Sequence, residues 1–300
     1  MSKTKSRAHP GKPAAQPRAQ VATPELKAWI IAQAEAGCRP EDVLAAMRGS
    51  GWSEDVAVAT LEETLVEHLA AKARKAAAQA AVSAVPEPAI ADAPSRVWAG
   101  DREVAILLTM KLPRVVVFGG LLSDEECDEM VARAGERLTR SETVVNSTGG
   151  SEINVARTSR GMFFGRAENP LCERIERRIA ALLRWPVENG EGLQILHYGP
   201  GAEYKPHHDY FDPTQPGSPS ILRRGGQRVG TLVTYLNTPA KGGATTFPDV
   251  GLEIAPIKGN AVFFSYDRPH ADTRTLHGGA PVVEGEKWVA TKWLREGEFV

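Results

Sequence analysis

The chain has 300 residues, of which 42% are hydrophobic and 24% are charged, as is typical of a soluble globular protein. Its net charge of -1 gives no electrostatic argument for a nucleic-acid or membrane partner, and no apolar run approaches the roughly 18 residues that span a bilayer. The basic N-terminus is not followed by the apolar segment of a signal peptide, so we expect a cytoplasmic protein. Three widely separated cysteines argue against a disulfide framework or a cysteine-based zinc site.

The first segment, residues 1–22, contains lysine, arginine, proline, alanine and glutamine but no acidic residue. Such a composition cannot bury a core, so we expect a disordered basic tail. A short basic arm can contact nucleic acid or an acidic partner, but a solubilising tail is the favoured interpretation because short charge runs are weak signals.

Three short helices are predicted within residues 23–84. Thr23 before Pro24 is typical of an N-cap followed by proline at the first helical position. Pro40 opens the second helix and Ser53 caps the third. Apolar residues recur on one face of each helix, so the segment is expected to form a small all-α domain.

The third helix is expected to continue past Leu69 as an exposed, alanine-rich rod. The three-helix unit resembles a ubiquitin-associated-type module in its Ala-Gly-Cys, Ala-Met and Gly-Trp turns. That resemblance implies a partner for the module, which the sequence does not identify. Residues 85–97 are rich in proline and alanine and are expected to form a linker, because each proline removes a backbone donor and disfavours helix before it.

Residues 98–300 are predicted to form one α+β domain. Ser123 with Glu126 is typical of a capping box that opens a helix to about residue 134, and a second helix begins at Asn169-Pro170. Thr143 to Phe164 is expected to form two strands around a Gly-Gly turn. Eight short strands then indicate an antiparallel jelly roll, or double-stranded β-helix, with flanking helices. They are expected at 193–198, 203–210, 228–237, 244–247, 251–255, 260–266, 272–278 and 287–295.

A candidate metal site lies in the segment from Tyr198 to Phe211. His207 and Asp209 are two residues apart in a predicted strand, so their side chains are expected on one face, whereas His208 points to the other. A third ligand would complete the arrangement of two histidines and one carboxylate that holds Fe(II) in non-haem oxygenases. His277 is the candidate for that ligand.

Lys287 follows His277 by ten residues in a strand of its own. Alternation places Lys287, Val289 and Thr291 on one face of that strand and the intervening residues on the other. A lysine beside valine and threonine suits a barrel interior, where a cation can hold the far carboxylate of a bound diacid.

These motifs together resemble the catalytic domain of prolyl 4-hydroxylases in the 2-oxoglutarate and Fe(II) dioxygenase superfamily. The resemblance spans about residues 112–300 and includes Tyr204-x-Pro-His, Gly242-Gly243-Ala-Thr-Thr-Phe-Pro and Gly285-x-Lys-Trp-x4-Trp. It implies a double-stranded β-helix that binds Fe(II), 2-oxoglutarate and O2, with ascorbate as a candidate reductant. It also implies hydroxylation of a C–H bond, with a prolyl residue of a protein or peptide as the first candidate substrate.

The resemblance further implies roles for individual residues. His207, Asp209 and His277 would hold Fe(II), and Lys287 would pair with the C5 carboxylate of 2-oxoglutarate. The remaining candidates are Tyr198 and Thr231 as further 2-oxoglutarate contacts, and Arg157 and Tyr204 as substrate contacts. The segment from Asp212 to Gly226 is either a mobile lid over the substrate or a plain surface loop.

Two other functions are consistent with the sequence. The substrate could be a free amino acid or small molecule, in which case the helical module is irrelevant to catalysis. Alternatively, the chain binds a partner through residues 23–67 and its barrel is silent or sensory, although the intact ligands and Lys287 weigh against that. Halogenation is disfavoured because Asp209 occupies the ligand position that a halide would need.

Overall fold

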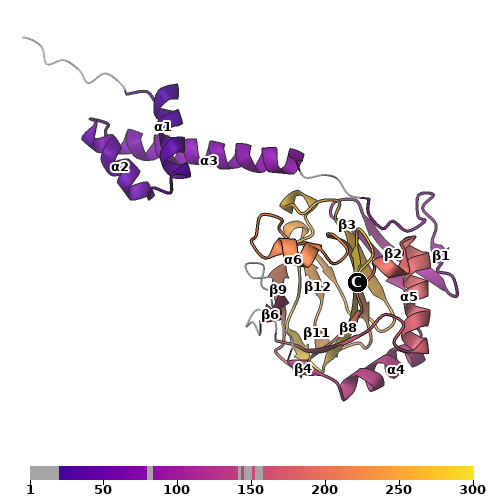
Figure 1. Ribbon diagram of the computed structural model, residues 1–300. Helices are drawn as coiled ribbons and strands as arrows, with labels where there is room; N and C mark the ends of the chain where they lie inside the picture. Colours follow the sequence, from indigo (N-terminus) through magenta and orange to yellow (C-terminus); the bar gives the residue numbers. More distant parts are fainter. Residues whose placement is uncertain (1–19, 80–83, 141–142, 145–150, 153–157) are drawn as a thin grey trace, which may run out of the picture. The chain divides into compact units, whose positions relative to one another are not determined.

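The computed structural model describes residues 20–79, 84–140, 143–144, 151–152 and 158–300. The chain forms two compact units, Met1–Gln79 and Ala80–Val300 (Figure 1). Most of the predicted basic tail, the tip of the predicted Gly-Gly turn and Arg157 lie outside the described residues. In the described part of the chain, every helix is too short or too polar to cross a membrane.

The N-terminal unit contains the three predicted helices: α1 (Pro24–Glu35), α2 (Pro40–Gly49) and α3 (Glu54–Gln79). The Thr23 hydroxyl accepts a hydrogen bond from the Leu26 amide and so caps α1. The three helices share a small apolar core, and α3 continues as far as Gln79. The buried residues of this core are Ile30, Val43, Met47, Ala57 and Leu61.

The second unit begins before the predicted domain boundary near residue 97. Within the expected linker, the Glu87 amide donates to the Leu183 carbonyl at 3.1 Å, and Pro86 and Pro88 are buried. Strand β1 (Arg96–Trp98) starts inside the same segment. Part of the segment 84–95 therefore packs against the rest of the second unit, where Pro86 and Pro88 are buried.

The second unit is built on a large antiparallel sheet. Within the described residues it has nine strands, and strands distant in sequence lie side by side in it. Across the sheet the order is β1, β2 (Glu103–Met110), β3 (Arg114–Gly119), β14 (Ala261–Ser265), β10 (Arg228–Tyr235), β17 (Lys287–Arg295), β8 (Leu193–Tyr198), β7 (Arg160–Phe164) and β4 (Thr139–Arg140).

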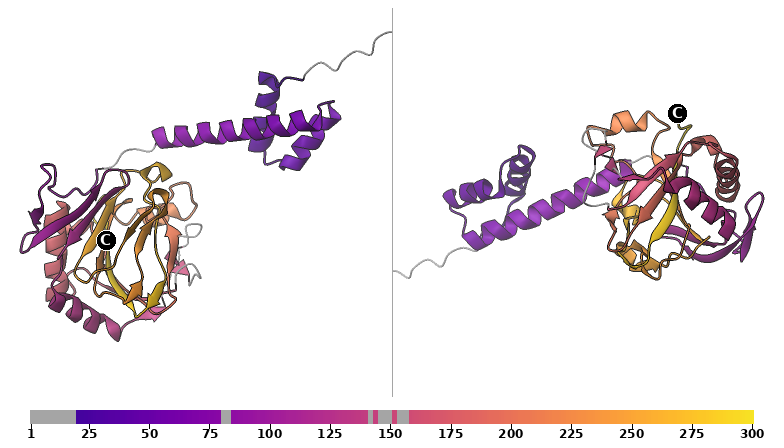
Figure 2. Two further views of the ribbon diagram at one scale, coloured as in Figure 1. Left: turned by 180° about the vertical axis from the view of Figure 1, so that it is seen from behind. Right: turned by 90° about the horizontal axis from the view of Figure 1, so that it is seen from below.

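A smaller antiparallel sheet faces the large one (Figure 2). Its four strands among the described residues carry much of the site, and two short hairpins accompany it. The order is β13 (Leu252–Ile254), β12 (Thr245–Phe247), β15 (His277–Gly279) and β9 (Tyr204–His207), with β11 (Lys241–Gly242) paired to β16 (Val282–Glu284) and β5 (Thr143–Val144) paired to β6 (Ser151–Glu152).

Side-chain alternation divides the apolar residues between two cores. On β14, Val262 and Phe264 face the inside of the jelly roll, whereas Ala261 and Phe263 face outward. The outward side chains are covered by α4 (Asp124–Gly135) and α5 (Pro170–Leu183), which lie along the outer face of the large sheet (Figure 1). The predicted capping box of α4 is present. This is the expected double-stranded β-helix with flanking helices.

Several local expectations were wrong. The segment predicted as a strand at 272–278 begins as a 3-10 helix, η3 (Ala271–Thr273), and only β15 is extended, because His270 caps the turn through its ring nitrogen. The predicted strand at 203–210 ends at His207, so Asp209 follows it. Strands β1 and β2 and helix α6 (Ser218–Leu222) were not predicted. The remaining short helical turns are η1 (Val187–Asn189) and η2 (Pro248–Val250).

Candidate metal and cosubstrate site

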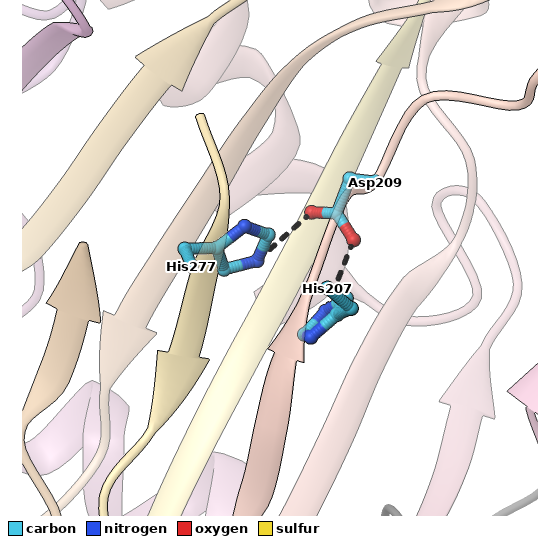
Figure 3. Close-up of side chains that lie close together, drawn as sticks. All are labelled: His207, Asp209 and His277. Atoms are coloured by element: carbon cyan, nitrogen blue, oxygen red, sulfur yellow. Dashed lines mark ion pairs between the residues drawn. The ribbon is translucent and has the colours of Figure 1, made fainter. Parts of the chain in front are cut away.

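The two candidate histidine ligands lie opposite each other on adjacent strands. His207 ends β9, and His277 begins β15, and the two residues are partners in the antiparallel register. Cross-strand partners bring their side chains close together, and the two ring centres are 4.4 Å apart. Asp209, two residues beyond His207, turns its carboxylate towards both rings (Figure 3).

The three side chains form a compact set of ligand atoms. His207 Nε2 is 3.5 Å from one Asp209 oxygen, and His277 Nε2 is 3.5 Å from the other. One ligand atom from each residue can be chosen so that all lie within 4.8 Å of one another. A first-row metal ion bound at about 2.0–2.2 Å from each atom fits such a spacing.

Second hydrogen bonds fix which nitrogen of each ring is available. His207 Nδ1 lies 2.9 Å from the Lys205 carbonyl, and His277 Nδ1 lies 3.0 Å from the Thr275 carbonyl. A carbonyl only accepts, so each Nδ1 carries the hydrogen and each Nε2 keeps its lone pair. This is the outer hydrogen bond that orients metal-binding imidazoles.

Electrostatics favour an ionised Asp209 carboxylate beside a neutral His277 imidazole. Burial by itself would raise the pKa of Asp209, but His277, His207 and Arg228 hold that pKa well below its usual value. Burial lowers the pKa of His277 to about 4. Because each Nδ1 donates to a carbonyl, the site offers two Nε2 lone pairs and one carboxylate, a donor set that fits Fe(II) and leaves coordination positions open.

Thr231 lies beside the metal ligands. Its hydroxyl donates to Asp209 Oδ2 at 2.8 Å and is 2.9 Å from the Tyr266 hydroxyl. Thr231 is completely buried on β10. The structure therefore places Thr231 directly against the Asp209 carboxylate. Its contact with 2-oxoglutarate stays a prediction.

Lys287 enters the same cavity from β17. It is 5% exposed, and its Nζ lies 5.6 Å from the centre of the Tyr198 ring and 5.8 Å from that of Tyr235. Among the described residues no carboxylate pairs with it, and burial lowers the pKa of the Lys287 amine to about 8. An unpaired buried cation is costly, so the cavity favours an anionic ligand.

Glycines make room for the lysine. A Cβ atom at Gly243 would lie 3.2 Å from Lys287 Cδ, and one at Gly279 would lie 3.8 Å from Lys287 Nζ. Gly243 also has a φ of 72°, a left-handed conformation that glycine adopts readily. These glycines leave space around the amine, as a ligand carboxylate requires.

The cavity joins the lysine to the metal ligands. Tyr198, predicted to contact 2-oxoglutarate, is the cross-strand partner of Lys287, and Tyr204 stacks on His207 with ring centres 3.7 Å apart. Both tyrosines line the cavity. The other lining residues are His207, Asp209, His277, Lys287, Leu196, Val233, Thr245, Gly278, Gly279, Val289, Thr291 and Trp293.

Sequence reasoning missed some residues of the site. Thr245 lines the cavity and accepts a hydrogen bond from the Tyr235 hydroxyl at 2.8 Å. Gln227 and Arg228 contact the segment that carries Asp209. Gln227 and Arg228 could have been noticed in the sequence as a polar pair at the start of an apolar strand, whose following residues are buried.

Comparisons with known proteins show which protein family has a site of this kind. A family model described as the 2OG-Fe(II) oxygenase superfamily matches residues 193–295, which include all three candidate ligands and Lys287. The chain is 40% identical to prolyl 4-hydroxylase 5 of Arabidopsis thaliana over 208 residues, covering 62% of this chain and 70% of that protein. It is also 40% identical to prolyl 4-hydroxylase 1 of the same plant over 225 residues, covering 66% and 77% respectively.

The protein is therefore a 2-oxoglutarate- and Fe(II)-dependent oxygenase. Within that class, it belongs to the prolyl 4-hydroxylase family. Among solved structures, it matches the viral collagen prolyl hydroxylase of Paramecium Bursaria Chlorella virus-1 in its 2-oxoglutarate complex, with 29% identity and a TM-score of 0.47. That match covers 60% of this chain and 95% of the viral chain.

Proposed function

We propose that the protein hydroxylates C-4 of a prolyl residue in a protein or peptide. The observation that carries this proposal is one cavity that holds His207, Asp209 and His277 together with the buried, unpaired amine of Lys287. The family to which the chain belongs supports the reaction. The printed names of its relatives support a prolyl substrate.

The three ligands would hold Fe(II) on the cavity side of the small sheet. When bound, Fe(II) supplies the centre at which 2-oxoglutarate and O2 react to give succinate, carbon dioxide and an oxidant for a C–H bond. His207 and His277 offer Nε2, and Asp209 offers a carboxylate oxygen. Thr231 donates to Asp209 Oδ2, which fixes the orientation of the carboxylate.

Lys287 would anchor the cosubstrate. Its amine would pair with the C5 carboxylate of 2-oxoglutarate, and that ion pair would remove the cost of a buried lone cation. Leu196, Val233 and Val289 give the same cavity an apolar wall. Tyr198 and Thr231 remain candidate contacts of 2-oxoglutarate, and Tyr204 and Arg157 remain candidate contacts of the substrate.

Other assignments are proposals of the same kind. Ascorbate as the reductant and a cytoplasmic location are predictions from the family resemblance and from the composition. We also propose that residues 23–67, which form a helical unit with its own small core, recruit a partner. The division into a tail, a helical module, a linker and a catalytic domain likewise remains a proposal.

The proposal is tested by product analysis of the purified protein. With Fe(II) present, 2-oxoglutarate should be converted to succinate, and Asp209→Ala should abolish the conversion. Turnover that survives this substitution would contradict the ligand assignment. Proline-rich peptides should gain one oxygen, detected by mass spectrometry and located at C-4 by NMR.

A free amino acid is the competing substrate. If free proline gains oxygen while every peptide fails, the reaction class stands but the substrate is a small molecule. If neither substrate gains oxygen and 2-oxoglutarate is not consumed, a partner-binding protein with a sensory barrel is favoured.

A further inference from the structure

Asp209 is the one candidate ligand that strand pairing does not hold. β9 ends at His207, and the small sheet fixes His207 against His277. Asp209 lies in the segment that follows, so other contacts must set its backbone position. The hydroxyl of Thr231 fixes one carboxylate oxygen but does not hold the main chain.

Gln227 binds both backbone groups of Phe211. Its Oε1 accepts from the Phe211 amide at 2.8 Å, and its Nε2 donates to the Phe211 carbonyl at 2.7 Å. The side-chain amide thus replaces the neighbouring strand that Phe211 lacks. Gln227 is 8% exposed, so water competes little for these hydrogen bonds.

Arg228 holds the segment at Asp209 itself. Its Nη1 donates a long hydrogen bond of 3.4 Å to the Asp209 carbonyl. Its guanidinium lies 4.8 Å from the Phe211 ring centre and 3.9 Å from that of Trp293. Glu191 fixes the guanidinium in place by accepting from Nε at 2.7 Å and from Nη2 at 3.0 Å.

A second arginine shares this environment without contacting the ligand. Arg295 donates to Glu191 at 2.7 Å and lies 5.0 Å from the Phe211 ring centre. Both arginines are buried. Within the described residues, however, no hydrogen bond links Arg295 to Asp209. Arg295 is therefore a matched control for Arg228.

We propose that Gln227 and Arg228 are positioning residues that hold the Asp209 to Phe211 segment so that the Asp209 carboxylate faces the metal site. This inference rests on the proposed function, because it assumes that Asp209 binds a metal ion. Loss of either side chain frees the segment to move, so that Asp209 spends less time facing the two histidines. Metal affinity is then expected to fall by about 10- to 100-fold, as for other residues that orient a ligand.

The test is titration of the metal-free protein with Co(II) alone, followed by its visible absorption. Gln227→Met and Arg228→Lys should weaken Co(II) binding by about 10-fold or more and alter the absorption bands. Arg295→Lys should lower the thermal midpoint of the metal-free protein about as much as Arg228→Lys, yet change Co(II) affinity by no more than about threefold. Gln227→Glu keeps the acceptor but loses the donor, and it serves if Gln227→Met does not fold.

The outcomes separate this inference from the proposed function. Equal losses of Co(II) affinity in Arg228→Lys and Arg295→Lys would mean that Arg228 only stabilises the fold. Unchanged Co(II) affinity in both Gln227 variants would mean the same for Gln227. Asp209→Ala is the reference for the ligand itself. If Asp209→Ala binds Co(II) as tightly as the unmodified protein, the metal assignment fails first.

Discussion

Lys287 and Lys292 are carried by the same strand, β17, and both are buried, but among the residues that the structure describes only Lys292 has a carboxylate partner. Lys292 Nζ lies 2.5 Å from Glu176 on α5, beneath the helical layer. Lys287 lies on the opposite face, inside the jelly roll, between the rings of Tyr198 and Tyr235. One strand thus carries a paired structural lysine and an unpaired lysine in the cavity.

Replacing Lys287 should weaken 2-oxoglutarate binding and leave metal binding intact. Lys287→Met is expected to raise the Kd for 2-oxoglutarate about 10- to 150-fold, because a hydrogen bond to a charged group contributes about 1.5–3 kcal/mol. Calorimetric titration of the metal-loaded protein measures this. Loss of metal affinity in the same variant would show that Lys287 has a structural role instead.

Replacing Lys292 should affect stability and not the site. Lys292→Met leaves the Glu176 carboxylate buried without its cation, which costs about 3–5 kcal/mol. Lys287→Met should instead stabilise the ligand-free protein, by about 1–3 kcal/mol, since it removes an unpaired buried cation. Denaturant unfolding of both variants compares the two lysines directly. Equal destabilisation would contradict their different pairing.

The pKa of Lys287 predicts a pH dependence of cosubstrate binding. Burial lowers that pKa to about 8, and only the protonated amine attracts a carboxylate. Bound 2-oxoglutarate raises the pKa again, so binding takes up a proton above pH 8. The Kd for 2-oxoglutarate should therefore rise towards tenfold per pH unit above about 8. Lys287→Arg, which keeps its charge, should abolish this rise in calorimetric titrations.

The Thr231 hydroxyl should matter for the metal through Asp209. Thr231→Val removes the donor to Asp209 Oδ2, so Fe(II) affinity should fall about 10-fold or more. Thr234→Val is the control, because Thr234 is buried on the same strand but on the other face. Metal titration of both variants decides the matter. Similar affinity in the two would mean that Thr231 does not orient the ligand.

Gly243 should be sensitive to a single methyl group. Gly243→Ala places a Cβ atom 3.2 Å from Lys287 Cδ and imposes a left-handed conformation that costs about 1–2 kcal/mol. The expected result is a raised KM for 2-oxoglutarate with Fe(II) affinity unchanged. Gly251→Ala is the matched control, since Gly251 also has a positive φ but has open space around its Cβ position. If Gly243→Ala lowers the thermal midpoint but leaves the KM for 2-oxoglutarate unchanged, the substitution strains the backbone without crowding Lys287.

The residues of the site could be found from sequence where local spacing determines geometry. Alternation along β17 places Lys287 with Val289 and Thr291 on the cavity side, as the structure shows. The spacing of His207 and Asp209 also indicated a shared site, although Asp209 lies beyond the end of β9 and not in the strand. The predicted capping box of α4 is also a local pattern. The jelly roll followed from the number and spacing of short strands.

What the sequence did not reveal depends on contacts between distant residues. Glu191 binds Arg228 from 37 positions away, and nothing near either residue signals that pairing. The role of Thr231 beside Asp209 depends on β10 lying beneath the loop after β9. The burial of Pro86 and Pro88 within the expected linker also depends on contacts with residues distant in sequence, such as Leu183, which accepts from the Glu87 amide.

The position of β17 links the order of synthesis to the assembly of the site. β17 lies between β10 and β8, both of which precede it in the chain, and it carries Lys287. While a ribosome is still translating residues before 287, those two strands lack the partner that joins them. A nascent chain can therefore carry all three candidate metal ligands and still lack Lys287, the proposed anchor of the cosubstrate.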